Sequence, residues 1–155
     1  MNDELNYLPV LINITNANIL IVGGGKVATH KAQILSRFTH HATVVAPDIS
    51  DELRQLPFTL IEEDFDERLL ENVNLLFVCT GNHQLNSYIK QLAAQRGILT
   101  SVCDNPALCD FISPAIERRD NITIAVGSDS KDVHRSIRIR NRIKQLIEDG
   151  ELQIE

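Results

Sequence analysis

Short apolar runs alternate with helix-like segments over the first two thirds of the chain. Continuous runs of Val, Ile and Leu are typical of strands covered on both faces, whereas apolar residues recurring every three or four positions are typical of helices. The alternation predicts an α/β fold built on a doubly wound parallel sheet with right-handed crossovers. The predicted strands are residues 18–22, 42–46, 58–61, 73–79 and 98–102, and the predicted helices are 26–37, a short one after Ser50, and 84–96.

The pattern changes after about residue 110. Strand-like runs at 111–116 and 122–126 flank a charged stretch, 117–121, at a spacing that predicts a hairpin. A basic helix with an apolar stripe is expected from about Lys131 to Glu148. A hairpin and one helix are too small to bury a core of their own. We therefore expect this part to pack on the first unit or, preferably, on a second copy of the chain in a homodimer.

Composition and charge exclude some partners. The chain has 155 residues, 43% of them hydrophobic and 23% charged, which suits a globular domain with a short extension. A net charge of −6 and an aromatic content of 5% disfavour a nucleic-acid binder. The charge is uneven, since residues 117–145 hold eight basic and four acidic residues while the rest holds 7 basic and 17 acidic. This basic segment is either an anion-binding face or a solvated helix.

Targeting and cysteine signals are weak. The N-terminus, Met1 to Glu4, lacks the basic and apolar regions of a signal peptide, and no run of about 18 apolar residues occurs. Cys79, Cys103 and Cys109 form no Cys-x-x-Cys pair and are too few for a disulfide framework. We therefore expect a cytoplasmic protein with reduced cysteines, no zinc site and no membrane partner.

Residues 23–28, GGGKVA, read G-x-G-x-x-A between a predicted strand and a predicted helix. In this pattern Gly23 permits a tight turn, Gly25 lets the backbone approach a pyrophosphate, and Ala28 allows close helix–strand packing. The helix N-terminus offers its N–H groups to the phosphates. This context predicts a Rossmann-type dinucleotide site at Gly23, Gly24 and Gly25, with a purely structural turn as the alternative.

Two other strand ends supply candidate cofactor contacts. An acid about 20 residues after such a turn normally holds the ribose hydroxyls. Here the second strand runs into Pro47 and Asp48 with no Arg beside them for a 2′-phosphate, which favours NAD over NADP unless the pair is an ordinary turn. Thr80, after the fourth strand, is a further candidate, or part of a plain turn in which Asn82 caps the next helix.

A carboxylate, Asp104, follows the fifth predicted strand at the same edge of the sheet. Placed there, it would face the nicotinamide end of a dinucleotide and could accept a proton as a hydride leaves. The same residue could instead form an Asx-turn into Asn105 and Pro106, and spacing alone does not separate the two interpretations.

Five segments in order make the chain resemble the precorrin-2 dehydrogenase family, which is the N-terminal module of sirohaem synthases: PVLI, NILIVGGGKVATHKAQIL, TVVAPDIS, SVCDNPALCDFISPAI and ITIAV. The resemblance extends from about Tyr7 to Ile147, and the run D-x-P-x-x-C-D-F-I-x-P-A-I is more specific than the glycine turn. It implies an NAD-binding Rossmann domain, residues 1–112, followed by a dimerisation and substrate-side segment, residues 113–155.

The resemblance also implies an activity: NAD-dependent dehydrogenation of precorrin-2 to sirohydrochlorin in sirohaem biosynthesis. By the matched motifs, Lys26, Val27, Pro47 and Asp48 correspond to cofactor-contacting positions. Asp104 corresponds to the aspartate expected to act as the base.

Precorrin-2 carries acetate and propionate carboxylates, so the resemblance gives the basic segment a use. The candidate arginines are Arg118, Arg135 and Arg138. The family's usual run S-x-G-G-x-S-P is replaced here by residues 127–133, GSDSKDV, so the substrate-side loop that holds Ser128 is altered. His134, next to this loop, is a substrate-side candidate or a solvent-facing histidine.

Two alternative functions stay open. The altered loop is the best support for a non-catalytic NAD-binding regulator, while longer family members are bifunctional dehydrogenases that also insert Fe²⁺. Because the chain ends at Glu155 and shows no cluster of metal ligands, we expect no metal site and no chelatase activity, and a separate chelatase as a possible partner. The scattered histidines His30, His40, His41 and His83 are expected at the surface.

Overall fold

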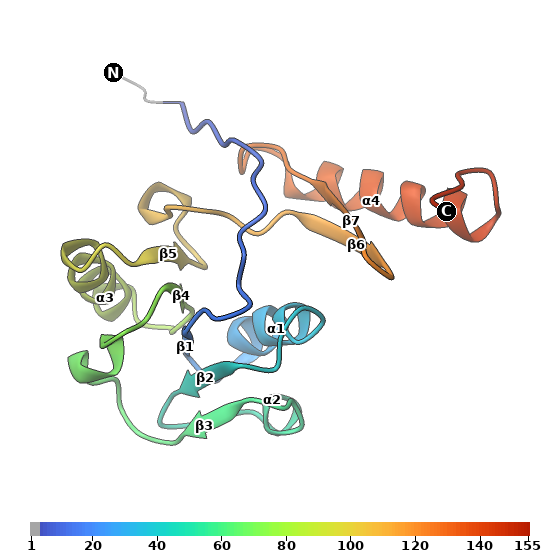
Figure 1. Ribbon diagram of the computed structural model, residues 1–155. Coiled ribbons are helices and arrows are strands. Elements are labelled where there is room, and N and C mark those ends of the chain that lie inside the picture. Colours follow the sequence, from blue (N-terminus) through green and yellow to red (C-terminus); the bar gives the residue numbers. More distant parts are fainter. Residues whose placement is uncertain (1–3) are drawn as a thin grey trace. The chain divides into compact units, whose positions relative to one another are not determined.

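A computed structural model describes residues 4–155 (Figure 1). Within them the chain divides into two compact units, the sheet unit, Val10–Phe111, and the hairpin unit, which combines residues 4–9 with 112–155. Of the stretch used for the signal-peptide prediction, residues 1–3 lie outside the described part. The division into functional domains at residue 112 stays a prediction.

The strands of the sheet unit form a five-stranded parallel sheet within residues 4–155. They are β1 (Ile19–Val22), β2 (Ala42–Val45), β3 (Thr59–Ile61), β4 (Leu75–Val78) and β5 (Leu99–Val102). Their order is β3-β2-β1-β4-β5, so the chain crosses over from one side of β1 to the other between β3 and β4. In such sheets ligands bind outside the carboxyl ends of the strands at this switch point. The predicted α/β fold class is confirmed.

Helices cover both faces of this sheet, which explains the continuous apolar runs. They are α1 (Lys26–Leu35), α2 (Asp51–Arg54) and α3 (His83–Gln95). Because side chains alternate along a strand, Ile19 and Ile21 join the core layer that contains α1 and α2, whereas Leu20 and Val22 join the layer that contains α3. Figure 1 shows α1 and α3 on opposite sides of the sheet.

The helix boundaries follow the predicted capping residues. The Ser50 hydroxyl accepts the Leu53 N–H at 3.1 Å and starts α2, and the Asn82 side chain accepts the Leu85 N–H at 3.1 Å and starts α3. Gly97 follows α3 with a φ of +67°, which is typical of a glycine that ends a helix. These local signals place α2 and α3 at the carboxyl edge of the sheet, where the site is expected.

The segment after β5 covers the exposed edge of that strand. Thr100 donates its N–H to Asp110 Oδ2 at 3.0 Å and accepts the Asp110 N–H at 2.8 Å. Lys90 Nζ lies 2.6 Å from the same carboxylate, and the Val102 N–H lies 3.2 Å from Cys109 Sγ. Cys109 and Asp110 belong to the motif D-x-P-x-x-C-D-F-I-x-P-A-I. They therefore have a structural role, because they contact backbone groups of β5 that would otherwise be unpaired at the edge of the sheet.

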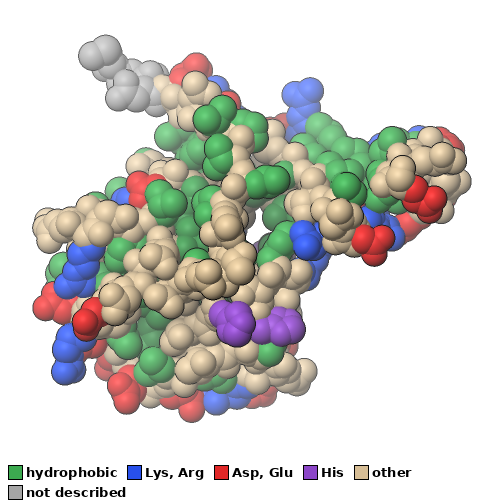
Figure 2. Space-filling model, viewed as in Figure 1, with side chains coloured by type: hydrophobic (Ala, Val, Ile, Leu, Met, Phe, Trp, Pro, Cys, Tyr) green, Lys and Arg blue, Asp and Glu red, His purple; other side chains and the backbone are tan. Residues whose placement is uncertain are grey.

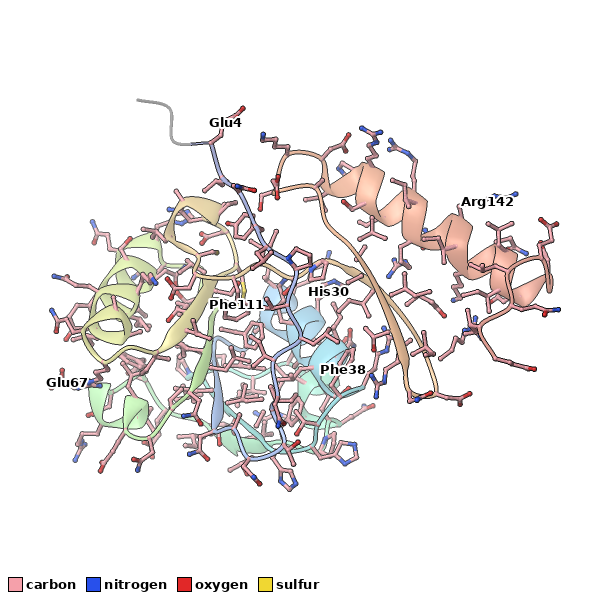
Figure 3. All side chains as sticks on the ribbon, turned by 45° about the horizontal axis from the view of Figure 1, so that its top comes forward. Glu4, His30, Phe38, Glu67, Phe111 and Arg142 are labelled. Carbon is pink, nitrogen blue, oxygen red and sulfur yellow. A yellow bond between two sulfur atoms is a disulfide. The ribbon has the colours of Figure 1, made fainter. Side chains whose placement is uncertain are left out.

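Three further features of the sheet unit were not predicted from the apolar pattern. Two short 3₁₀ helices, Glu67–Leu70 and Pro106–Leu108, contain too few residues to show a period. Phe111 packs edge-on against Phe77 with ring centroids 5.4 Å apart, and Figure 3 shows Phe111 beside the sheet. This contact ends the sheet unit.

The hairpin unit contains β6 (Ala115–Arg119), β7 (Ile122–Val126) and α4 (Val133–Glu148). The hairpin is confirmed, but the predicted connecting stretch 117–121 is wrong in extent, because residues 117–119 belong to the strand. Backbone pairing does not require apolar side chains, and the Glu117 carboxylate is satisfied by Arg119 at 2.7 Å. The turn is confined to residues 120–121.

The predicted apolar stripe of α4 is only partly covered. The helix packs on β6 and β7. Ile143 and Ile147 are half-buried, whereas Val133 is 59% exposed and Ile137 is 37% exposed. Figure 2 shows hydrophobic side chains at the surface of the α4 region. The hairpin unit thus leaves apolar side chains in contact with solvent.

Membrane-spanning helices and clusters of metal ligands are both absent from residues 4–155. Within residues 4–155 no helix combines the length and the apolar character needed to cross a bilayer. In the same residues, no three side chains of His, Cys, Asp or Glu come together as a possible metal site.

Candidate active site

The glycine turn after β1 is pressed against two neighbouring segments. Gly23 has a φ of +131°, and a Cβ on it would collide with the carbonyl group of Cys79. A Cβ on Gly24 would collide with the carbonyl oxygen of Asp48. The sequence pattern treated Gly24 as a variable position, but its close approach to Asp48 makes it as restricted as Gly23.

Gly25 differs, because a Cβ on it would meet no other atom within 4 Å. It is the N-cap residue of α1, and it has no side chain that could cap the helix. The first turn of α1 holds no acidic residue, and both Lys26 and Val27 are exposed. The N–H groups at this helix end therefore face open space and suit an anion such as a pyrophosphate.

A hydrogen-bond network fixes the link after β2 beside this turn. The Ser50 N–H donates to the Gly24 carbonyl at 2.9 Å, and the hydroxyls of Ser50 and Thr29 lie 2.7 Å apart. Thr29 is also 2.7 Å from the Gly25 carbonyl. The network holds residues 47–48 next to the glycine turn, at the end of β2 where a ribose-binding acid is expected.

Asn86 of α3 joins the ends of β4 and β5. It is 1% exposed. Its carbonyl oxygen accepts the Thr80 hydroxyl, and its amide nitrogen donates to the Thr80 carbonyl at 3.1 Å. The same nitrogen lies 3.5 Å from Asp104 Oδ1. Thr80 and Asp104 are thereby brought to one rim, as their places after two adjacent strands predict.

The second oxygen of Asp104 also has a partner. His83 Nδ1 lies 2.5 Å from Asp104 Oδ2, and the His83 side chain is 83% exposed. His83 lies at the surface, as predicted, but its contact with Asp104 was not predicted, because the two residues come from different elements. Asn86 was missed too, although a polar residue in helical register with Ile89 and Ala93 on the buried face of α3 is a signal that could have found it.

The glycine turn, residues 47–48, Thr80 and Asp104 line one cavity of about 550 Å³ at the carboxyl ends of β1, β2, β4 and β5. Its volume lies within the range of small-molecule sites. Asp64 and Phe65 also line it and were not predicted. The cavity is lined by every predicted cofactor and catalytic candidate: Gly23, Gly24, Gly25, Lys26, Val27, Pro47, Asp48, Thr80 and Asp104. A dinucleotide suits this wall, because an open helix N-terminus and an acid after β2 occur in one cavity.

A disulfide crosses the floor of the cavity. Cys79 and Cys103 are bonded with their Cα atoms 5.2 Å apart, and Figure 3 shows the bond in yellow. The prediction of reduced cysteines is wrong for this pair. The register pairs Val78 with Val102, so the next residue on each strand lies side by side, and sequence spacing alone does not reveal this. Cys109 is a free thiol.

The substrate-side candidates belong to the hairpin unit. Ser128 accepts the Asp132 N–H at 3.1 Å, and Arg118 donates to Thr123 Oγ1 at 2.8 Å. His134, Arg135 and Arg138 lie exposed on α4. Arg135 and Arg138 are three positions apart and share a side of the helix. Figure 3 shows Arg142, one turn further on, projecting away from the hairpin.

Other arginines of the basic segment hold the hairpin unit together. Arg119 contacts Glu117 at 2.7 Å and Glu148 at 3.2 Å, and its hydrogen bond to Glu117 raises the pKa of this guanidinium above its usual value. Arg140 donates to the Ile116 carbonyl at 2.9 Å. The basic segment is therefore not uniformly available to an anion.

A family model described as "Putative NAD(P)-binding" matches residues 10–115. The chain belongs to this NAD(P)-binding family. The match spans the sheet unit with its glycine turn and Asp104. Family membership supports NAD as the cofactor of this chain.

Curated relatives of this NAD(P)-binding chain are siroheme synthases. That of Psychrobacter sp. strain PRwf-1 is 36% identical over 150 residues, which cover 94% of this chain and 31% of the relative. That of Nitrosomonas europaea is 36% identical over 148 residues, which cover 92% of this chain and 31% of the relative. The chain thus spans about a third of the length of these relatives.

A solved structure named SirC, precorrin-2 dehydrogenase, has the same fold. It matches with a TM-score of 0.77 at 23% sequence identity, and the match covers 90% of this chain and 70% of that chain. The likeness confirms that a parallel sheet with helices, a hairpin and a further helix occur together in another protein.

Proposed function

We propose that the protein catalyses NAD-dependent dehydrogenation of precorrin-2 to sirohydrochlorin in sirohaem biosynthesis. The observation that carries the proposal is the single cavity at the carboxyl edge of the sheet, which combines the open N-terminus of α1 with Asp104. The siroheme synthase relatives and the precorrin-2 dehydrogenase of like fold support this reaction over other dehydrogenations.

The wall of the cavity suits NAD. The open turn at Gly25 and the exposed backbone at Lys26 and Val27 would take the pyrophosphate. Asp48 and Pro47, at the end of β2, would contact the ribose, and a carboxylate there disfavours the 2′-phosphate of NADP. Thr80 would lie along the nicotinamide half. When bound, the nicotinamide supplies the hydride acceptor for the reaction.

Asp104 acts as the base. The overall reaction removes one hydride and one proton from the substrate, so a proton acceptor is needed beside the hydride acceptor. Asp104 is the carboxylate at the β5 end of the cavity, and its side chain is 35% exposed, so that it is open to a substrate and to water. It takes the proton from the substrate and later releases it to solvent.

The hairpin unit supplies substrate contacts. Precorrin-2 carries several carboxylates, and Arg135 and Arg138 present two exposed guanidiniums on one side of α4. Arg118, Ser128 and His134 are further candidates for these contacts. We also propose a homodimer, supported by the exposed apolar residues Val133 and Ile137. The cytoplasmic location and a separate chelatase partner stay predictions.

The test is a single assay with an Asp104→Asn control. Precorrin-2 and NAD⁺ are mixed with the protein, and sirohydrochlorin is followed by its absorbance. We expect turnover by the wild type, and a loss of about 10²-fold or more in kcat for Asp104→Asn with unchanged NAD affinity. Turnover by Asp104→Asn at the wild-type rate would remove Asp104 as the base.

The same assay separates the alternative functions. NAD binding without any product would favour a non-catalytic regulator. Loss of the sirohydrochlorin signal after addition of Fe²⁺, which is the substrate of a chelatase, would favour the bifunctional dehydrogenase and ferrochelatase.

A further inference from the structure

The carboxylate of Asp104 is held from one helix at both of its oxygens. His83 and Asn86 are three positions apart in the first turns of α3, so their side chains lie on the same side of the helix. Asn86 is buried and lies 3.5 Å from Oδ1, and His83 lies 2.5 Å from Oδ2. One helix start therefore sets the direction in which this carboxylate points.

The two contacts differ in strength. At 3.5 Å the amide of Asn86 is at the outer limit of a hydrogen bond, so Oδ1 keeps lone pairs for another partner. The His83 contact is closer, since Nδ1 lies 2.5 Å from Oδ2. His83 thus holds Oδ2, and Oδ1 is the oxygen free to accept a proton.

The position of His83 at the start of α3 fixes where its ring lies relative to Asp104. His83 is the first residue of α3, directly after Asn82, which caps the helix by accepting the Leu85 N–H at 3.1 Å. The cap fixes the backbone from which the ring projects. Because the His83 side chain is 83% exposed, its ring contributes little to the core.

We propose that His83 is a positioning residue for the dehydrogenation, and that it holds Asp104 Oδ2 so that Oδ1 is presented to the proton of the substrate. This inference rests on the proposed function, in which Asp104 is the base. The proton balance is unchanged by it: the substrate loses a hydride to NAD⁺ and a proton to Oδ1, and the proton then leaves to water. His83 neither gains nor loses a proton overall.

Two substitutions at residue 83 separate positioning from a general structural effect. His83→Leu removes the N–H while keeping bulk, and we expect kcat to fall about tenfold with KM and NAD affinity unchanged. His83→Asn places an amide N–H close to the position of Nδ1, so we expect it to recover most of the lost kcat. The matched control is His30→Leu on α1, an exposed histidine that does not line the cavity and should leave kcat unchanged.

A double variant tests whether the effect passes through Asp104. In the Asp104→Asn background, His83→Leu should cause no further loss of kcat. Equal losses in both backgrounds, or equal values for His83→Leu and His83→Asn, would overturn the inference. Wild-type kcat in His83→Leu would overturn it while leaving the proposed function intact, whereas absence of turnover by the unmodified protein would overturn the proposed function itself.

Discussion

Each unit of the molecule contains a strand joined to a helix by a short link, residues 23–25 after β1 and residues 127–132 after β7, and the two links are built in opposite ways. The turn from β1 to α1 consists of glycines, with Gly23 at a φ of +131°. The turn from β7 to α4 has no glycine where the backbone is left-handed, since Asp129 and Ser130 have φ values of +52° and +61°. The first helix starts without a side-chain cap, whereas Asp132 caps the second.

The difference lies in how the backbone groups at the helix starts are satisfied. In the second turn, the Asp132 side chain accepts the Arg135 N–H at 2.8 Å, and Asp129 accepts the Tyr7 N–H at 3.2 Å. In the first turn, the space beside Gly25 is open and no side chain of α1 accepts these N–H groups. A side-chain cap satisfies N–H groups at a helix start, whereas an uncapped start beside a cavity leaves N–H groups that a ligand can bind.

The variant expected to have the largest effect on the first turn is Gly24→Ala. A Cβ at this position would collide with the backbone of Asp48, which cannot move without disturbing β2. We expect the free energy of unfolding to fall by about 3 kcal/mol, with loss of measurable NAD binding. Chemical denaturation and calorimetric titration with NAD measure the two effects.

Gly25→Ala is the matched control for that variant. Gly25 has a φ of −90° and no neighbour within 4 Å of the added Cβ, so the unfolding free energy should change by less than about 1 kcal/mol. NAD binding should still weaken by about tenfold, because the methyl group enters the space assigned to the pyrophosphate. Equal loss of stability in the two glycine variants would contradict the difference between them.

The next largest effect should come from reduction of the disulfide below the first turn. Gly23 rests on the backbone of Cys79, which is bonded to Cys103 on the adjacent strand. Reduction should lower the free energy of unfolding by about 2 kcal/mol, because the bond joins residues 24 positions apart and so restricts the unfolded chain. Denaturation with and without a reductant measures it.

The Cys79→Ser and Cys103→Ser double variant supplies the control for reduction. It should show the lowered stability in both conditions, while Cys109→Ser, which removes the free thiol, should keep the response to reductant. Identical stability of the oxidised and reduced wild type would show that the bond does not brace the turn.

The sequence predicts the helices and strands better than the contacts between them, for a physical reason. Strands buried on both faces and helices with caps at Ser50 and Asn82 carry local signals, so their order and ends can be read from the chain. The pairing of Cys79 with Cys103, and of His83 with Asp104, depends on which strands become neighbours. No local pattern contains that information, and the same applies to the surface that Val133 and Ile137 leave exposed.

Loss of the helix cap in the second turn should lower the free energy of unfolding by less than reduction of the disulfide does. Asp132→Ala removes the side chain that accepts the Arg135 N–H, and loss of such a cap costs about 1 kcal/mol. We expect this decrease in unfolding free energy together with unchanged NAD affinity, because the turn belongs to the hairpin unit. Asp132→Asn should retain most of the stability, since an amide oxygen also caps a helix. Weaker NAD binding in Asp132→Ala would mean that the second turn also serves the cofactor.

The smallest effect should be a gain of stability from Ser130→Gly. Ser130 has a φ of +61°, a conformation that costs a residue with a Cβ about 1 kcal/mol, whereas glycine adopts it freely. Part of the gain is offset by the larger backbone entropy of glycine in the unfolded chain, so the net increase should be about 0.5 kcal/mol. Asp129→Gly should gain nothing, because Asp tolerates this region and its carboxylate would be lost as the acceptor of the Tyr7 N–H. Thermal denaturation of the two variants beside the wild type measures the difference. If Ser130→Gly and Asp129→Gly were destabilised alike, the positive φ values of Asp129 and Ser130 would not be a source of strain.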